Sequence, residues 1–389
     1  MKKTNQIQVA LAPMAGVSDS AFRLMNQMGG CDLTYSEMAH VNGVSYLGRK
    51  TFNLLQTHLS EKKYIVQLFG NNPQYFARAT KIISQKGLPV ASYKPFDKQQ
   101  LNFVSQIVTS LTARYSIKNN PELASFQLFW RNFLKFQADL ILLQTLPKKQ
   151  RELYLIPAGL DINLGCPAKK VFGHGSGAGL FTDIPKIRQV VETVLENTDL
   201  PISLKLRTSV RDVSVFDALN ALADLPLKHI MIHGRSYEQG FSGNIDVETI
   251  KKTIAKYPQF EFWVNGGIID YSSAQKIILA TGCQRLGIAR GSWGNPLLAN
   301  TIKKIPDFAE TPKLGVSAKS IPVHCALAYI HTILNSQSKG SKGFFEIRKH
   351  LAWYFKDFTG AKDWRKKLVT VKSIPEVEKI LKQILKAKK

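Results

Sequence analysis

Two glycine-rich stretches follow short apolar runs in the second half of the chain. They read FWVNGGI at residues 262–268 and LGIARGSWGNP at residues 286–296. Glycine lets backbone N–H groups approach an anion closely, and Arg290 would add a charge-assisted hydrogen bond. Turns also need glycine, so one such stretch alone decides little, but two in succession favour a phosphate site.

Polar side chains that interrupt or end apolar runs are a second signal. Lys205 stands in ISLKLRT, where it must either face an open site or be desolvated at a cost of several kcal/mol. Arg207 lies two positions on, hence on the same side of a strand, and the two cations predict a negatively charged partner. The alternative for Lys205 is an ion pair with a core carboxylate. Gln67 and Asn265 can each donate to and accept from a heterocycle, and His233 ends a further run.

The stretch DINLGCPAKK, residues 161–170, places Cys166 between a glycine and a proline. Those neighbours favour a turn that exposes the thiol, and two lysines follow at once. Buried apolar packing is the commoner fate of a free cysteine, and we expect it for Cys31, Cys283 and Cys325. Because the four cysteines form no CxxC pair, we expect no metal site and no disulfide framework, and a reducing compartment fits best.

Eight short apolar runs must position these side chains. They read VALAPMAG, LTYSEM, YIVQLFG, GLDINLGCP, ISLKLRT, HIMIHGR, FWVNGG and RLGIARG. Helical spacing between most of them, as in IPKIRQVVETVLE, predicts alternating strands and helices. Eight such units predict a closed (β/α)8 TIM barrel of the α/β class, with its site at the carboxyl ends of the strands. Phosphate sites in such barrels commonly use the loops after the last two strands.

Two parts of the chain lie outside this pattern. The third and fourth runs start 95 residues apart, and helical spacing with a cap pair at Asn120 and Pro121 predicts a helical insertion over about residues 88–157. The barrel should therefore occupy residues 1–310 with this insertion. Residues 318–389 are helical in pattern and basic, which predicts a separate all-helical domain.

The charge balance favours a polyanionic partner. Lys and Arg number 53 against 28 Asp and Glu, a formal net charge of +25. A solubility role is the alternative, but residues 319–389 concentrate 16 basic against 5 acidic residues, as a binding face would. Since no apolar run approaches ~18 residues, we expect a cytoplasmic protein without a membrane anchor. We also expect a monomer.

The motifs together resemble the tRNA-dihydrouridine synthases, the flavin-dependent family that reduces specific uridines in tRNA. The matching stretches, in family order, are LAPMAGVSDSAFR, YSEM, VQLFG, DINLGCPAKKV, GSGAGL, LKLRT, IHGRS, VNGGI, ARGSWGNP and IRKHLAWY. The resemblance implies FMN in the barrel mouth and NADPH as a transient reductant. The FMN-binding residues that it implies are Pro13, Met14, Ala15, Gln67, Lys205, His233, Asn265, Gly266, Gly267, Ala289 and Arg290. Many members have glycine in place of Ala289, but backbone N–H donation survives that change.

The resemblance also implies the reaction. Reduced flavin N5 gives hydride to C6 of uracil, and Cys166 gives the proton to C5. An unperturbed thiol pKa near ~8.5 keeps this group protonated at neutral pH. Because the target base must leave its stack, the enzyme has to hold a folded RNA. The tRNA-contacting residues implied are Asn163, Lys169, Arg207, Arg348, Lys349 and His350.

Four questions stay open at this level. An FMN barrel could reduce free pyrimidines or other small alkenes, and a non-catalytic RNA-binding protein could use the barrel as a scaffold. Residues 348–350 could belong to a solvated helix face packed over core aromatics. The insertion, with 9 basic and 4 acidic residues, could contact RNA or serve only packing.

Overall fold

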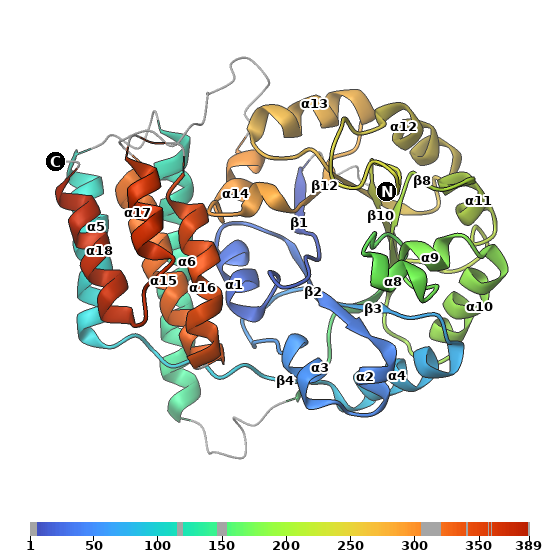
Figure 1. Ribbon diagram of the computed structural model, residues 1–389, viewed down its shortest axis with the longest axis horizontal. Helices are drawn as coiled ribbons and strands as arrows, with labels where there is room; N and C mark the ends of the chain where they lie inside the picture. Colours follow the sequence, from blue (N-terminus) through green and yellow to red (C-terminus); the bar gives the residue numbers. More distant parts are fainter. Residues whose placement is uncertain are drawn as a thin grey trace. The chain divides into compact units, whose positions relative to one another are not determined.

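The structure is a computed structural model that describes residues 6–114, 120–145, 154–304, 320–339, 341–356, 358 and 360–387. Eight parallel strands close into a barrel in this part of the chain, in the order β1-β12-β11-β10-β7-β6-β3-β2 (Figure 1). They are β1 (Gln8–Leu11), β2 (Leu33–His40), β3 (Tyr64–Phe69), β6 (Gly159–Asn163), β7 (Ile202–Arg207), β10 (His229–His233), β11 (Glu261–Asn265) and β12 (Arg285–Ile288). Each of the eight apolar runs forms one strand, so the predicted TIM barrel is confirmed.

Helices connect these strands, as the parallel pairing requires. They include α2 (Val41–Ser45), α3 (Arg49–Leu54), α4 (Pro73–Lys86), α8 (Lys169–Gly173), α9 (Ala178–Phe181), α10 (Ile184–Leu195), α11 (Val215–Asn220), α12 (Val247–Lys256) and α13 (Tyr271–Thr281). Local sequence fixes where they begin: the Asn72 side chain accepts from the backbone N–H of Gln74 at 2.9 Å, and Asp183 does the same for Lys186 at 3.1 Å. A proline in the first turn follows each of these caps.

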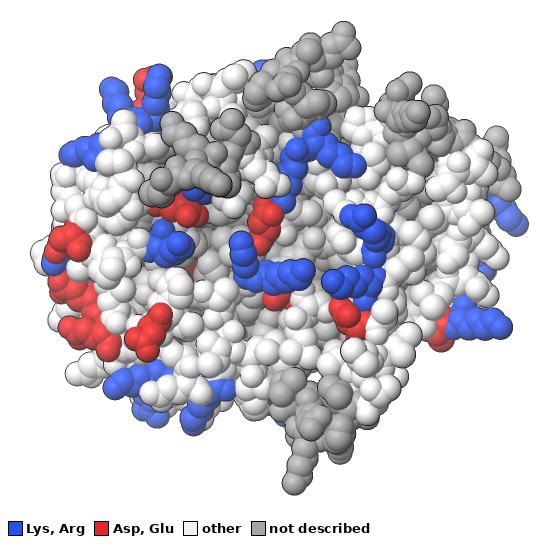
Figure 2. Space-filling view, turned by 180° about the vertical axis from the view of Figure 1, so that it is seen from behind, with Lys and Arg blue, Asp and Glu red and all other residues white. Residues whose placement is uncertain are grey.

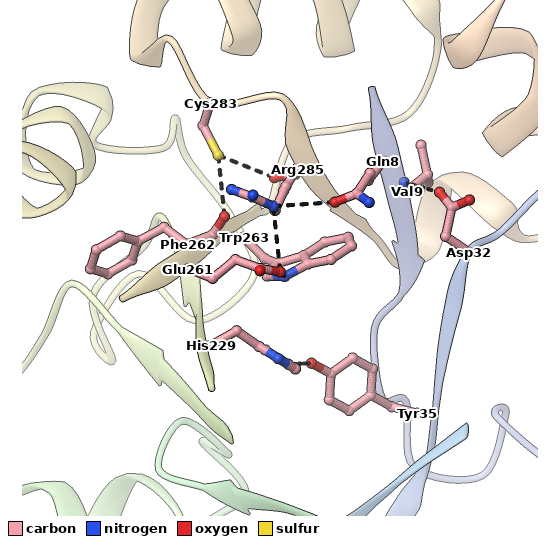
Figure 3. A network of polar contacts seen from close by, with 10 residues as sticks. All are labelled: Gln8, Val9, Asp32, Tyr35, His229, Glu261, Phe262, Trp263, Cys283 and Arg285. Atoms are coloured by element: carbon pink, nitrogen blue, oxygen red, sulfur yellow. Dashed lines mark hydrogen bonds and ion pairs between the residues drawn. The ribbon is translucent and has the colours of Figure 1, made fainter. Parts of the chain in front are cut away.

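A polar network links the amino ends of several barrel strands (Figure 3). Arg285 directs its Nε to Gln8 Oε1 at 3.2 Å and to Glu261 Oε1 at 3.4 Å. Deeper in the barrel, the Tyr35 hydroxyl lies 2.5 Å from His229 Nε2. Burial lowers the pKa of His229 to about 4, and Lys228 and Arg285 act in the same direction. This end of a TIM barrel ordinarily serves stability rather than chemistry.

The chain divides into two compact units whose segments alternate along the sequence. Unit 1 takes Met1–Asp19, Asp32–Val90 and Glu152–Ala289, which include the barrel strands. Unit 2 takes Ser20–Cys31, Ala91–Arg151 and Arg290–Lys389. Its helices are α1 (Ser20–Met28), α5 (Lys98–Arg114), α6 (Pro121–Thr145), α14 (Leu298–Lys303), α15 (Ile321–Lys339), α16 (Ser341–Tyr354), α17 (Ala361–Leu368) and α18 (Ile374–Lys386).

The insertion is helical, as predicted, and belongs to the core of unit 2. Asn120 Oδ1 caps α6 by accepting from the backbone N–H groups of Glu122 and Leu123, both at 3.1 Å. Phe103 of α5 lies edge-on to Tyr329 of α15, with ring centroids 4.6 Å apart. Residues 115–119 and 146–153 of the insertion, and the predicted boundary between residues 310 and 318, lie outside the described residues.

A short pairing closes the neck of the insertion. Strand β4 (Leu88–Pro89) runs antiparallel to β5 (Tyr154–Leu155), so the chain leaves and re-enters unit 1 at adjacent points. The helices between those points therefore add to unit 2 without interrupting the barrel ladder. Such an arrangement fits the packing role that was one of the two open interpretations of the insertion.

The surface charge is mixed on the face drawn in Figure 2. Lys and Arg side chains lie there in separate groups, with Asp and Glu beside several of them. In the residues that the structure describes, no helix is both long and apolar enough to cross a bilayer.

Candidate active site

Cys166 stands in a turn directly after β6, and Asn163 holds that turn. The Asn163 Oδ1 accepts from the backbone N–H of Gly165 at 3.1 Å and from that of Cys166 at 2.9 Å. An Asx turn of this kind fixes the backbone from Asn163 to the amide of Cys166. The predicted exposing turn is present, and the side chain that builds it is Asn163.

The Cys166 thiol is partly exposed, whereas Cys31, Cys283 and Cys325 are buried, as expected from their settings. Burial raises the pKa of Cys166 above its ordinary value, while a backbone hydrogen bond at Ala168 and the charge of Arg207 act in the opposite direction. The net rise keeps the thiol protonated at neutral pH. A protonated, accessible thiol can act as a proton donor.

A row of buried, hydrogen-bonded polar groups lies in the barrel wall next to this turn. Asn163 Nδ2 donates to Gln67 Oε1 at 2.8 Å, and Gln67 Nε2 donates to Asp161 Oδ2 at 2.7 Å. Ser203 Oγ donates to the other carboxylate oxygen of Asp161 at 2.7 Å. Burial raises the pKa of Asp161 to about 6, although these hydrogen bonds and Lys205 oppose the rise. These hydrogen bonds connect three neighbouring strands, β3, β6 and β7, and fix the side-chain amide of Gln67.

Lys205 lies beside Asn163 in the register of β6 and β7 and is partly exposed. Burial lowers its pKa to about 8, and Arg207 lowers it further, while Asp161 and Cys166 act to raise it. Lys205 is therefore cationic at neutral pH and loses its charge more readily than an ordinary lysine. Lys205 is partly exposed and also feels the charge of Asp161, so the open-site interpretation and the carboxylate interpretation both stay predictions.

Arg207 is buried, with 1% of its surface exposed. Its Nε donates to the carbonyl of Gly165 at 2.8 Å, and its Nη1 donates to the carbonyls of Ser236 and Gly240, both at 2.8 Å. The guanidinium also lies 5.6 Å from the ring centroid of Phe241. In this structure Arg207 clamps the cysteine turn to the loop after β10, so these donors are directed at backbone rather than at solvent.

His233 ends β10 and packs closely on the loop after β11. Its Nε2 lies 3.2 Å from Arg235 Nη1, and the side chain is 7% exposed. Gly266 has a φ of +109°, and a Cβ placed there would lie 2.8 Å from the His233 ring. No other residue fits this close approach, so Gly266 and His233 are positioned by one another.

The predicted phosphate residues follow the carboxyl ends of β11 and β12. Asn265 Nδ2 donates to the carbonyl of Gly287 at 2.7 Å, which ties the two strand ends together. Gly267 adopts a φ of +73°, and a Cβ placed there would lie 3.7 Å from the Ile245 side chain. Ala289 packs on a small apolar cluster inside the barrel, and the exposed Arg290 begins a 3-10 turn, Arg290–Ser292.

The loop after β1 carries the other predicted flavin residues, Pro13, Met14 and Ala15. The backbone N–H of Met14 donates to Ser18 Oγ at 2.9 Å, and its carbonyl accepts from the N–H groups of residues 17 and 18. Pro13 and Met14 are partly exposed and Ala15 is exposed. The loop therefore presents backbone at the mouth of the barrel.

The predicted RNA residues divide into exposed and internal groups. Lys169 is exposed at the start of α8. Arg348 is partly exposed and donates through Nε to the carbonyl of Val371 at 2.8 Å, and Lys349 is also partly exposed. His350 is 1% exposed and packs against Phe22, with ring centroids 5.3 Å apart. Contact of these residues with RNA stays a prediction.

Sequence reasoning did not single out Asp161 and Ser203. A signal existed, because both are polar residues inside apolar runs and the barrel register places them side by side. The positioning roles of Asn163 and Arg207 were also missed, since their backbone partners become visible only when the loops are folded.

Comparison of the sequence with those of known proteins identifies the family of this chain. The model of the dihydrouridine synthase (Dus) family matches residues 10–89 and 112–389. A probable tRNA-dihydrouridine synthase 1 of Synechocystis sp. is 30% identical over 232 residues, which cover 59% of this chain and 64% of that protein. The tRNA-dihydrouridine synthase B of Xanthomonas axonopodis pv. citri is 25% identical over 368 residues, which cover 92% of this chain and 86% of that protein. The chain therefore belongs to the dihydrouridine synthase family of enzymes.

Proposed function

We propose that this protein reduces uridine in tRNA to 5,6-dihydrouridine, with FMN as cofactor and NADPH as the source of reducing equivalents. The observation that carries the proposal is the turn of Cys166, which presents a partly exposed, protonated thiol at the barrel mouth next to Lys205. Family membership and the names of the relatives support the substrate, and the net charge of +25 suits a polyanion.

The residues at the mouth fit FMN by their chemistry. Gly266 and Gly267, both with positive φ, offer backbone close to a phosphate, and the exposed Arg290 supplies positive charge. Lys205 offers a cation that would stabilise negative charge on a reduced isoalloxazine ring. Gln67 is held by Asp161 and Asn163, so its amide is preoriented rather than free to rotate.

The chain's own residues would then divide the work. When bound, reduced FMN supplies the hydride that adds to C6 of the uracil ring. The Cys166 S–H bond breaks as its proton moves to C5, and the resulting thiolate regains a proton from water. Asn163 and Arg207 hold the backbone around the thiol, which keeps the proton donor within reach of the base.

A direct experiment tests the assignment. The purified protein should be yellow and should form dihydrouridine in an unmodified tRNA transcript when supplied with NADPH. Cys166→Ala should keep FMN and bind the transcript but form almost no dihydrouridine, because the proton donor is lost. Full turnover by this variant would remove the assigned acid.

The same assay with free uridine separates the main alternative. A tRNA-specific enzyme should reduce free uridine far more slowly than the transcript. Equal rates would favour a reductase of small pyrimidines, and a colourless protein that does not take up FMN would favour a non-catalytic role.

A further inference from the structure

Helices α2, α3 and α4 lie close together on unit 1 (Figure 1). Their side chains form an aromatic and basic surface beside the barrel mouth. Helix α2 begins at Val41, directly after β2, and three residues separate the end of β3 from the start of α4. Strands β2 and β3 are neighbours in the barrel. Their carboxyl ends therefore bring α2 and the first turn of α4 to the rim on which the candidate active site stands.

Two tyrosines form the centre of this surface. The hydroxyl groups of Tyr46 and Tyr75 lie 3.3 Å apart, and Ser45 Oγ donates to the carbonyl of Tyr75 at 3.0 Å, which joins α2 to α4. Arg78 places its guanidinium 5.3 Å from the centroid of the Tyr46 ring. Tyr46 is nevertheless 63% exposed, so much of its ring remains open to solvent. An exposed tyrosine held by a cation from a neighbouring helix is a preformed platform for stacking.

Leu47 supplies an independent observation. It has a φ of +55° and is 52% exposed, just after the end of α2. Glycine is the residue that normally occupies a left-handed position at a helix end, and a leucine there is strained. The backbone of Leu47 closes the end of α2, since its N–H donates to the carbonyl of Val44 at 2.9 Å. The exposed leucine side chain takes no part in that hydrogen bond, which points to a role in binding.

The charges around this platform select the partner. The 14 residues of α4 and residues 41–54 contain Arg49, Lys50, Arg78, Lys81 and Lys86 but no Asp or Glu. A flat aromatic ring, an apolar neighbour and cations without carboxylates fit a nucleobase with its phosphates.

We propose that Tyr46 and Leu47 form an RNA-stacking platform that receives an unpaired nucleotide of the tRNA while the target uridine occupies the barrel mouth. This inference rests on the proposed function and adds a contact outside the reacting site. The cations at Arg49, Lys50 and Arg78 bind the phosphates on either side of that nucleotide. The platform contributes to affinity and placement, whereas chemistry stays with Cys166.

The test compares Tyr46→Ala with Tyr154→Ala, using an unmodified tRNA transcript as the probe. Tyr154 is 64% exposed and lies on β5, so it controls for the loss of an exposed tyrosine. Loss of one base–aromatic stack should raise the Kd of Tyr46→Ala for the transcript about 5- to 150-fold. The rate of dihydrouridine formation at saturating RNA should stay equal to that of the wild type. Tyr154→Ala should match the wild type in both measurements.

Leu47→Gly separates binding from folding. Glycine suits the left-handed conformation, so this variant should unfold at the same or a higher urea concentration than the wild type while its Kd for the transcript rises. A variant that is structurally favoured yet binds RNA less well cannot owe the defect to misfolding.

Three results would overturn the inference. A Tyr46→Ala Kd equal to that of Tyr154→Ala, with an active wild type, refutes the platform and leaves the proposed function intact. Unchanged RNA affinity together with wild-type self-association that Tyr46→Ala abolishes assigns the surface to a protein contact instead. A wild type that binds FMN but modifies no transcript refutes the proposed function itself, and this inference with it.

Discussion

Substitution of Arg207 by lysine distinguishes two roles for this residue. The family resemblance implies that Arg207 contacts RNA, whereas the structure directs its donors to the carbonyls of Gly165, Ser236 and Gly240. Lysine keeps the positive charge but lacks the planar guanidinium that lets arginine donate to three carbonyls at once. If two of the three hydrogen bonds are lost at about 1.5 kcal/mol each, the free energy of unfolding should fall by about 3 kcal/mol.

The same substitution should slow the chemical step. Gly165 precedes Cys166, so release of its carbonyl lets the thiol move, and a displacement of about 1 Å can cost about 100-fold in rate. We expect Arg207→Lys to be reduced by NADPH at the wild-type rate. Its flavin should be reoxidised by saturating tRNA about 100-fold more slowly. Anaerobic stopped-flow measurement of flavin absorbance separates these two half-reactions.

An exposed lysine provides the control. Lys169→Ala removes a predicted RNA contact without touching the clamp, so it should raise the Kd for tRNA and leave the saturated rate of flavin reoxidation unchanged. The reasoning is refuted if Arg207→Lys behaves like Lys169→Ala, with weaker RNA binding and a normal chemical step. In that case Arg207 turns toward the RNA as the resemblance implied.

Three further predictions follow from other parts of the structure. The rate of dihydrouridine formation should fall as pH rises through about 8, where Lys205 loses its charge, and Lys205→Arg should abolish this step in the pH–rate profile. Burial depresses the pKa of His229 in the folded protein to about 4, whereas the unfolded chain binds this proton near pH 6.5. The free energy of unfolding should therefore fall by about 3 kcal/mol as the pH is lowered from 6.5 to about 4. Urea denaturation should show a smaller decline in His229→Gln. Gly294→Ala should lower the free energy of unfolding by about 3 kcal/mol, since a Cβ there would lie 2.2 Å from the carbonyl oxygen of Trp353. Gly282 has a similar φ but open space around it, so Gly282→Ala should lower the free energy of unfolding by only about 1 kcal/mol in the same assay.

Much of the barrel could be predicted because its signals are local. Each buried parallel strand needs an apolar run, and each run ends where the chain reaches the polar mouth, so the run boundaries also marked Lys205, His233 and Asn265 as site candidates. Helix caps such as Asn120 are equally local, since the capped N–H groups lie within three residues of the cap.

The parts that escaped prediction depend on contacts between residues distant in sequence. The carbonyls that Arg207 reaches lie 29 to 42 positions away, so strand alternation gave its side but not its burial. His350 stands in a basic stretch that favours an exposed helix face, yet Phe22 and His331 pack against it from elsewhere in unit 2. The pairing of Tyr46 with Tyr75 was missed for the same reason, because the two tyrosines are 29 residues apart.

The alternation of segments between the two units has a consequence for synthesis on the ribosome. Helices α1 and α5 end at residues 28 and 114, but the long helix α15 on which they pack begins only at residue 321, more than two hundred residues later. Their apolar faces therefore stay exposed until α15 has been translated, and chaperones can bind them during that time. Slow codons between these helices would lengthen this exposure and favour aggregation of the nascent chain. For the same reason, a stop codon near residue 310 would leave these early helices without their partners rather than release an intact barrel.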